Sequence, residues 1–226
     1  MSYLVTGTDT GVGKTLISCA LLHGLAARGR RAVGFKPVAA GVDADGMNDD
    51  AKALLAVSAV PLSYEQVNPY CLREAIAPHL AARNENVNIE LSRVLDAYRE
   101  LDAQHDIVIV EGAGGFRVPL NDTQDSADLA QALNLPVILV VGMRLGCLNH
   151  ALLTVEAIAA RGLMLAGWVA NATVADMAMR DENIAALRQR IAAPLLGTVP
   201  HMAEPDVKVV AGYLDFGVVA SSQRTT

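Results

Sequence analysis

The chain has 226 residues, 52% of them hydrophobic, which suits one sizeable domain and requires no second one. Its formal net charge of -6 and the lack of a basic run argue against nucleic acid or an anionic membrane as the main partner. No apolar stretch approaches the roughly 18 residues of a membrane span, and the N-terminus enters a strand directly in place of a signal peptide, so we expect residues 1–226 to form a single cytoplasmic domain.

Short apolar runs alternate with helical patterns along most of the chain. In chain order, we expect a strand at 3–5, a helix at 16–27, a strand at 31–36, helices at 49–57 and 89–103, a strand at 106–111, a helix at 126–133, a strand at 136–141, a helix at 149–160, a strand at 164–170, a helix at 182–191 and a strand at 195–199. Residues 60–88 have weak periodicity broken by prolines, so we expect loops and short helices there.

The apolar runs do not alternate with polar residues, which is typical of strands covered on both faces. Separated by helices, such strands predict an α/β fold with a doubly wound, mostly parallel sheet and helices on both faces. Ligands of these sheets bind beyond the carboxyl ends of the strands. The residues that follow the strands should therefore share one rim, namely 7–14, Lys36, Glu111, the loop after Val141, Asn171 and Pro200.

A glycine-rich loop, Gly7-Thr8-Asp9-Thr10-Gly11-Val12-Gly13-Lys14-Thr15, lies between the first strand and the first helix. Its glycines let the backbone approach an anion, and N–H groups at a helix start attract phosphate. Lys14 adds a charge near the β- and γ-phosphates, and the Thr15 hydroxyl suits Mg²⁺. Five residues separate Gly7 from Gly13 where the general motif has four, so we interpret the loop as a P-loop variant. The alternative is a glycine-rich turn without a ligand.

Acidic residues could complete a metal site beside this loop. Glu111 ends an apolar strand and precedes Gly112-Ala113-Gly114-Gly115, as does the second acidic motif of P-loop proteins, whose carboxylate holds the metal. The alternative for Glu111 is a solvated acid at a strand end. Asp50 lies at a helix start, where it could be either a helix cap or a second metal ligand.

Other rim residues are open to two interpretations. Lys36 is either a surface lysine or a group that stabilises a transferring phosphoryl group. Asn171 is either a turn residue or an amide that pairs with an adenine edge. No Asn-Lys-x-Asp sequence for guanine recognition occurs, which argues against a signalling GTPase. The cysteines and histidines show no spacing typical of a disulfide framework, a zinc site or a catalytic triad.

The motifs taken together resemble the dethiobiotin synthetase family over residues 2–202. They are Gly7-Thr-Asp-Thr-x-Val-Gly-Lys-Thr15, Lys36-Pro-Val38, Asn68-Pro-Tyr70, Pro78-His79, Val110-Glu-Gly-Ala-Gly-Gly115, Leu135-Pro-Val-Ile-Leu-Val-Val-Gly142, Leu145-Gly-Cys-Leu-Asn-His150, Gly167-Trp-Val-Ala-Asn171 and Pro194-Leu-Leu-Gly197. The resemblance implies a P-loop NTPase-like fold and an ATP-dependent cyclo-ligase that makes dethiobiotin from 7,8-diaminononanoate and CO₂. It also implies a homodimer with the substrate site at its interface.

The resemblance further implies roles for individual residues. Mg²⁺ would be bound by Thr15, Asp50 and Glu111, and the catalytic residues would be Lys14, Lys36 and Thr10. ATP would contact Gly11, Val12, Gly13, Lys14, Thr15, Leu16, Glu111, Gly112, Ala113, Gly114, Asn171, Ala172, Pro200, His201 and Met202. The diamine would contact Thr10, Lys36 and Ala40, and its distal carboxylate would meet Gly146, Cys147, Leu148 and Asn149 from the other subunit.

Two positions depart from the family pattern. Gly11 stands where some relatives carry Glu, and Ala40 stands where many carry a hydroxyl residue that orients the substrate. A nonenzymatic ATPase switch of the partition type is the alternative function. Such a switch would carry a lysine near the start of its loop, where this chain has Asp9.

Overall fold

The computed structural model describes residues 2–220 and contains a six-stranded sheet in which every pair of neighbouring strands is parallel. The strand order is β2-β5-β1-β6-β7-β8. The strands are β1 (Tyr3–Gly7), β2 (Ala32–Phe35), β5 (Ile107–Glu111), β6 (Val137–Met143), β7 (Leu165–Ala172) and β8 (Leu195–Val199). The central position of β1 places the glycine-rich loop in the middle of the sheet's carboxyl rim.

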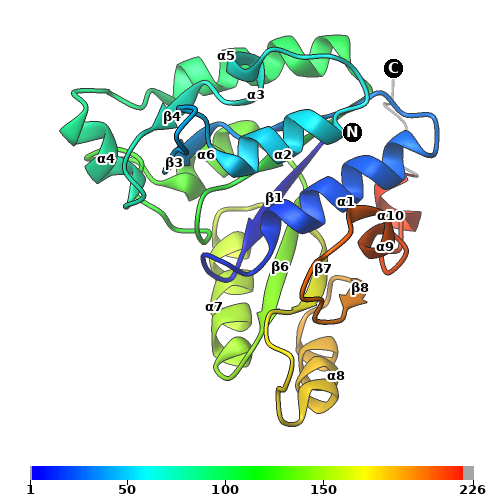
Figure 1. Ribbon diagram of the computed structural model, residues 1–226. Coiled ribbons are helices and arrows are strands. Elements are labelled where there is room, and N and C mark those ends of the chain that lie inside the picture. The colour runs from blue at the N-terminus through cyan, green and yellow to red at the C-terminus, as the bar shows by residue number, and fades with distance from the viewer. Residues whose placement is uncertain (1, 221–226) are drawn as a thin grey trace.

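Helices cover both faces of this sheet, as predicted. One face carries α1 (Lys14–Ala26), α2 (Asp49–Val57) and α9 (Val207–Ala211), and the other carries α5 (Leu91–Gln104), α6 (Ser126–Leu133), α7 (Cys147–Ala160) and α8 (Arg180–Arg190). Figure 1 shows α1 and α2 in front of the strands. Successive residues of β1 enter opposite cores, because Tyr3 and Val5 pack against α1 while Leu4 joins the cluster containing α5 and α6.

Glycines determine where two helices begin. Gly13 has a φ of 90° and Gly146 a φ of 95°, so each takes the left-handed conformation and forms the N-terminal cap of the helix that follows. As a result α1 starts at Lys14 and α7 at Cys147, each two residues earlier than predicted. The loop-to-helix junction therefore presents Lys14 and Thr15 in the first turn of α1.

Residues 60–88 form the predicted short helices, α3 (Tyr64–Val67) and α4 (Pro78–Asn84), and also a strand that we did not predict. This strand, β4 (Tyr70–Leu72), pairs in parallel with β3 (Val38–Ala40) in a second, two-stranded sheet. Strands of three residues are too short to show a periodic pattern in the sequence. The described residues end with α9 and α10 (Gly217–Ala220), which we also did not predict.

Within residues 2–220, the helices all fall short of the length and apolar character needed to cross a membrane.

Candidate active site

A cavity of about 1040 Å³ opens at the carboxyl ends of the central strands. Ten of the residues predicted to bind nucleotide, substrate or metal line it, namely Thr10, Gly11, Gly13, Lys14, Thr15, Lys36, Ala40, Asp50, Ala113 and Gly114. They come from segments up to about a hundred residues apart, which the parallel strands bring to one rim. Most of the predicted rim residues of the glycine-rich loop, together with Lys36, therefore border one concave site, and the binding roles predicted for them stay predictions.

The glycine-rich loop adopts a conformation that other residues could not take. At Gly13 a Cβ atom would lie 2.2 Å from Nδ2 of Asn171, and φ is positive, so only glycine fits. The Lys14 side chain is buried, and its Nζ donates a hydrogen bond to the carbonyl of Asp9 at 3.1 Å. Burial, together with the charge of Lys36, lowers the pKa of Lys14. The loop thus holds a buried cation, Lys14, at the first residue of α1.

Thr15, Asp50 and Glu111 meet in this site. The Thr15 hydroxyl lies 2.7 Å from Oδ1 of Asp50 and 2.9 Å from Oε1 of Glu111. Glu111 is fully buried, and its Oε2 has no hydrogen-bond partner, which is costly for a carboxylate oxygen. Hydroxyl and carboxylate oxygens are the ligands that Mg²⁺ prefers. The three residues therefore fit a bound Mg²⁺, which would satisfy the unpaired oxygen.

Asp50 does not cap its helix. The cap of α2 is Asn48, whose side chain accepts a hydrogen bond from the Ala51 N–H at 3.3 Å. Asp50 instead faces Thr15 and Lys36. Burial raises the pKa of the Asp50 carboxyl, but Lys36 and Thr15 outweigh that effect, so its pKa is lowered and it remains ionised.

Lys36 is a buried residue and not a surface lysine. Its side chain is 3% exposed, and Nζ lies 2.6 Å from Oε1 of Glu111, 2.9 Å from Oδ2 of Asp50 and 3.3 Å from the carbonyl of Gly112. Burial alone would lower the pKa of Lys36, yet the charges and hydrogen bonds of the two carboxylates outweigh it and raise the pKa. Lys36 therefore stays protonated beside Asp50 and Glu111, the two predicted metal-binding carboxylates, and it lines the cavity.

A second, smaller cavity of about 170 Å³ lies on the other side of the glycine-rich loop. Its lining includes eight residues predicted to contact ATP, namely Gly11, Gly13, Leu16, Asn171, Ala172, Pro200, His201 and Met202. Asn171 lies inside β7 and is 5% exposed, so it is not a turn residue. Its Nδ2 donates to the carbonyl of Val12 at 2.8 Å, which leaves its carbonyl oxygen to accept from a ligand. This cavity has the location and lining expected of a base pocket.

The predicted carboxylate-binding turn lies apart from both cavities within one chain. Gly146, Cys147, Leu148 and Asn149 line neither of them. The Cys147 side chain is buried, and burial raises the pKa of its thiol. The adjacent Leu145 is 98% exposed.

Several lining residues were not predicted from the sequence. Arg117 and residues 75–77 border the large cavity, together with Pro78 at the start of α4, and Arg117 and residues 75–77 come from irregular segments whose path the sequence pattern does not reveal. Asn48 also lines it, and its Nδ2 donates to the Gly41 carbonyl at 2.7 Å. Arg144 pairs with Asp9 of the glycine-rich loop. Of these residues, Arg144 lies in the predicted rim, because it follows a strand.

Comparisons with known proteins show the family of the chain. A family model described as "AAA domain" matches residues 1–207. The ATP-dependent dethiobiotin synthetase BioD of Aromatoleum aromaticum is 56% identical over 216 residues, covering 94% of this chain and 96% of the relative. The protein of the same name from Nitrosospira multiformis is 52% identical over 220 residues, covering 97% of each.

Solved structures of low identity share the fold. The septum site-determining protein MinD from Pyrococcus horikoshii, complexed with Mg-ADP, superposes with a TM-score of 0.54 at 16% identity, covering 98% of this chain and 90% of that one. The receptor FtsY from Elizabethkingia anophelis gives a TM-score of 0.55 at 16% identity, with 95% of this chain covering 63% of that one. The fold is therefore that of the P-loop NTPases, and the relatives of more than 50% identity show that the chain belongs to the family of the AAA domain model and to the ATP-dependent dethiobiotin synthetases.

Proposed function

We propose that the chain is an ATP-dependent cyclo-ligase that forms dethiobiotin from 7,8-diaminononanoate and CO₂ and releases ADP and phosphate. The observation that carries this proposal is the position of Lys36, which is buried between Glu111 and Asp50 and lines the same cavity as Lys14 and Thr10. That cavity has room for a second substrate beside the glycine-rich loop, residues 7–15, which we call the phosphate loop. The names of the relatives supply the product.

The first step would be carbamate formation. An alkylamine is protonated in water, but next to the cationic Lys14 and Lys36 its charged form is disfavoured, so a neutral amine is available. The amine nitrogen bonds to the carbon of CO₂ and loses one proton to solvent. The resulting carbamate is an anion, which the two lysine side chains would hold in the cavity that Thr10 also lines.

Phosphoryl transfer and ring closure would follow. A carbamate oxygen bonds to the γ-phosphorus in line as the bond to the β-phosphate oxygen breaks, which gives ADP and a carbamic-phosphoric anhydride. Lys14 and Lys36 offset the charge that develops on the transferring group. Thr15, Asp50 and Glu111 would hold Mg²⁺, which supplies further charge neutralisation when it is bound. The second amine then attacks the carbamoyl carbon and expels phosphate, so no side-chain nucleophile is required.

We further propose that the enzyme is a homodimer in which α7 of one subunit completes the substrate site of the other. The N-terminus of a helix favours anions, so the Gly146–Asn149 turn suits the distal carboxylate of the substrate. Leu153 is 56% exposed and lies four residues after Asn149, on the same side of α7. Exposed apolar side chains beside a binding turn are what an interface would cover.

The test is ATP turnover by the purified enzyme with and without diaminononanoate and bicarbonate. We expect ADP release to depend on both, and to equal the amount of dethiobiotin formed. Vigorous ATP hydrolysis at a rate that does not depend on diaminononanoate or bicarbonate would refute the ligase proposal and favour the partition-type ATPase switch.

A further inference from the structure

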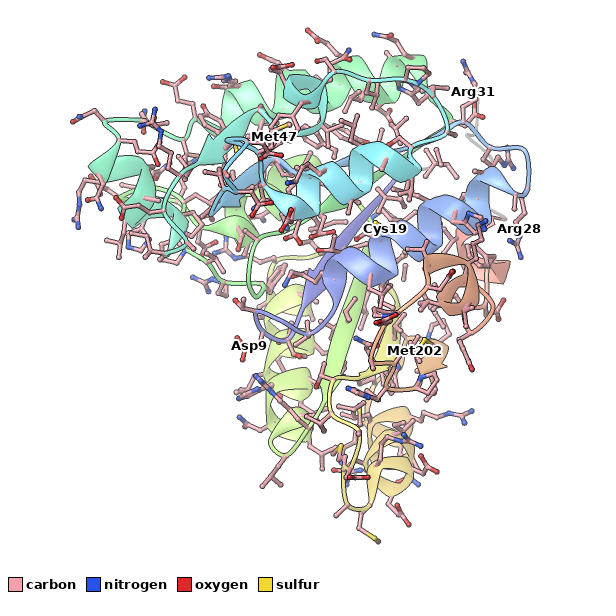
Figure 2. The ribbon with its side chains drawn as sticks, viewed as in Figure 1. Asp9, Cys19, Arg28, Arg31, Met47 and Met202 are labelled. Carbon is pink, nitrogen blue, oxygen red and sulfur yellow. The ribbon has the colours of Figure 1, made fainter. Side chains whose placement is uncertain are left out.

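The phosphate loop contains a carboxylate, Asp9, which is unfavourable in a site for a polyanion. Asp9 lines the large cavity, and Figure 2 shows it on the loop between β1 and α1. Its Oδ1 accepts a hydrogen bond from the Thr10 N–H at 2.7 Å, and its carbonyl accepts one from Lys14 Nζ at 3.1 Å. Asp9 therefore holds two of the residues on which the proposed chemistry depends.

The lysines around the cavity are engaged by other groups, so they do little to offset the negative charge of Asp9. Lys36 is already shared between Asp50 and Glu111. Lys14 is needed for the phosphates and bonds to Asp9 only through the backbone carbonyl. Charges a few ångströms apart lie well within the screening length of salt, so an uncompensated Asp9 carboxylate would repel a bound triphosphate.

Arg144 supplies the missing positive charge. Its guanidinium Nη2 bonds to Oδ2 of Asp9, the oxygen that does not hold Thr10. Arg144 follows β6 directly, and β6 is the neighbour of β1 in the sheet. The loop is also tied to β6 through Thr8, whose N–H donates to the Val140 carbonyl at 3.0 Å. The Arg144 backbone is therefore anchored at a fixed place relative to the loop.

The same residue borders the start of α7. The Arg144 carbonyl accepts a hydrogen bond from the Cys147 N–H at 3.0 Å, in the first turn of that helix. Arg144 thus links the phosphate loop, through its side chain, to the turn where the substrate carboxylate is expected to bind, through its backbone carbonyl.

From this geometry we infer that Arg144 is a positioning residue for the phosphate loop, which acts through Asp9 by neutralising its charge and by fixing the carboxylate whose other oxygen accepts from the Thr10 N–H. Arg144 itself does not touch ATP in this account. The inference rests on the proposed function for the identity of the nucleotide, but it concerns nucleotide binding and not the ring-forming chemistry.

A double-mutant cycle tests this role. We expect Arg144→Ala to weaken binding of a non-hydrolysable ATP analogue, and to raise the KM for ATP, by about tenfold, a typical effect of removing one nearby charge. Since the turnover chemistry uses Lys14 and Lys36, kcat should change much less than KM. Arg144→Lys should restore most of the affinity, because a lysine retains the charge.

The decisive comparison uses Asp9→Asn as the background. If Arg144 acts by offsetting Asp9, then Arg144→Ala should change affinity less than about twofold once the carboxylate is gone. An equal loss in both backgrounds would show that Arg144 contacts the nucleotide itself, and unchanged affinity in Arg144→Ala would show that it has no role. Either result overturns the inference.

A matched control is Arg99→Ala, which removes another exposed Arg–Asp pair, the one between Arg99 and Asp96, in α5. It should leave affinity unchanged. Calorimetric titration of the analogue needs no diamine, so the inference can fail while the ligase reaction stands. Conversely, the coupling between Arg144 and Asp9 can be found as expected while the ligase proposal fails.

Discussion

Lys36 is the residue on which the proposed chemistry depends most. It is 3% exposed and is held by two carboxylates, so its ammonium group is fixed before any substrate arrives. Such pre-positioned charges stabilise a transition state more than groups that must reorganise. The buried pair of Lys36 and Glu111 is therefore a feature of the active site, and its removal should affect catalysis before it affects nucleotide binding.

We predict that Lys36→Ala lowers kcat about 100-fold or more, in the range seen when one stabilising group is removed from a transition state. The affinity for an ATP analogue should change far less, because the phosphate loop and Lys14 remain. Stopped-flow measurement of ADP release and calorimetric titration separate the two effects. Lys52→Ala is the control, since Lys52 forms ion pairs with Asp43, Asp45 and Asp49 near the surface. Equal losses of turnover and affinity in Lys36→Ala would contradict the assignment.

Asn171 should control which base the enzyme accepts. One N–H of its amide group donates to the Val12 carbonyl, and its carbonyl oxygen can accept a hydrogen bond from the amino group of adenine, where guanine carries a carbonyl. We predict that Asn171→Ala reduces the preference for ATP over GTP about tenfold, the value of one hydrogen bond.

Competition assays with both nucleotides would measure this preference. Asn183→Ala is the control, since Asn183 makes the same kind of amide-to-carbonyl bond, to Met179, on the exposed surface of α8. An unchanged preference in Asn171→Ala would place the base elsewhere.

Residue patterns predicted part of this site and not the rest. Lys36 and Glu111 each follow an apolar strand, so their common rim could be predicted from the fold class alone. The contact of Asp50 with both depends on the path of residues 41–48, which have no regular structure. Arg117 and residues 75–77 also reach the cavity from irregular segments, so their positions could not be predicted either. Patterns of hydrophobicity reveal periodic elements, and they carry no information on loop paths.

Helix α6 is stabilised by a local arrangement that depends on pH. Its cap, Asp125, accepts from the N–H groups of Ala127 and Asp128, while the Asp128 carboxylate accepts from the Asp125 N–H and pairs with Arg161 after α7. The hydrogen bond from the Asp125 N–H, followed by that from Arg161, lowers the pKa of the Asp128 carboxyl. A lowered pKa in the folded state means that the ionised form stabilises the fold.

We predict that Asp128→Asn lowers the free energy of unfolding at neutral pH. The contribution of Asp128 is fully present above the ordinary aspartate pKa and is lost as the pH falls through the lower pKa of the folded protein. The difference between wild type and variant should therefore shrink as the pH falls below about 4, the ordinary aspartate pKa. Urea denaturation across this range measures it, with Asp122→Asn as an exposed control. A difference that stays constant with pH would argue that the carboxylate charge is not involved.

Elements with a clear hydrophobic pattern were predicted closely, and those without one were not. The limits of α2, α6 and β8 match the prediction, because each has a clear pattern and a distinct end. The pair of β3 and β4 was missed, since three-residue strands have no measurable period and pair across about 30 positions of sequence. Helix α9 has five residues and begins after its cap, Asp206, whose side chain accepts a hydrogen bond from the Lys208 N–H at 2.7 Å.

At the scale of the whole molecule, the proposed dimer explains why the α7 turn is separate from the cavities of its own chain. We predict that Leu153→Asp, which places a charge among exposed apolar residues of α7, converts the dimer to monomers and raises the KM for the diamine at least tenfold. Light scattering after size-exclusion chromatography measures the mass, and steady-state kinetics measure the KM. The control is Met179→Asp, at a residue that is 64% exposed at the start of α8. A monomeric wild type that retains full activity would refute the dimer.

The most direct test of the central proposal follows isotopically labelled bicarbonate, with diaminononanoate, ATP and Mg²⁺ present. We expect one labelled carbon to enter the ureido ring of dethiobiotin for each ADP released, and omission of the diamine to stop ADP release. Steady ADP release with no labelled product, or release that continues unchanged without the diamine, would contradict it.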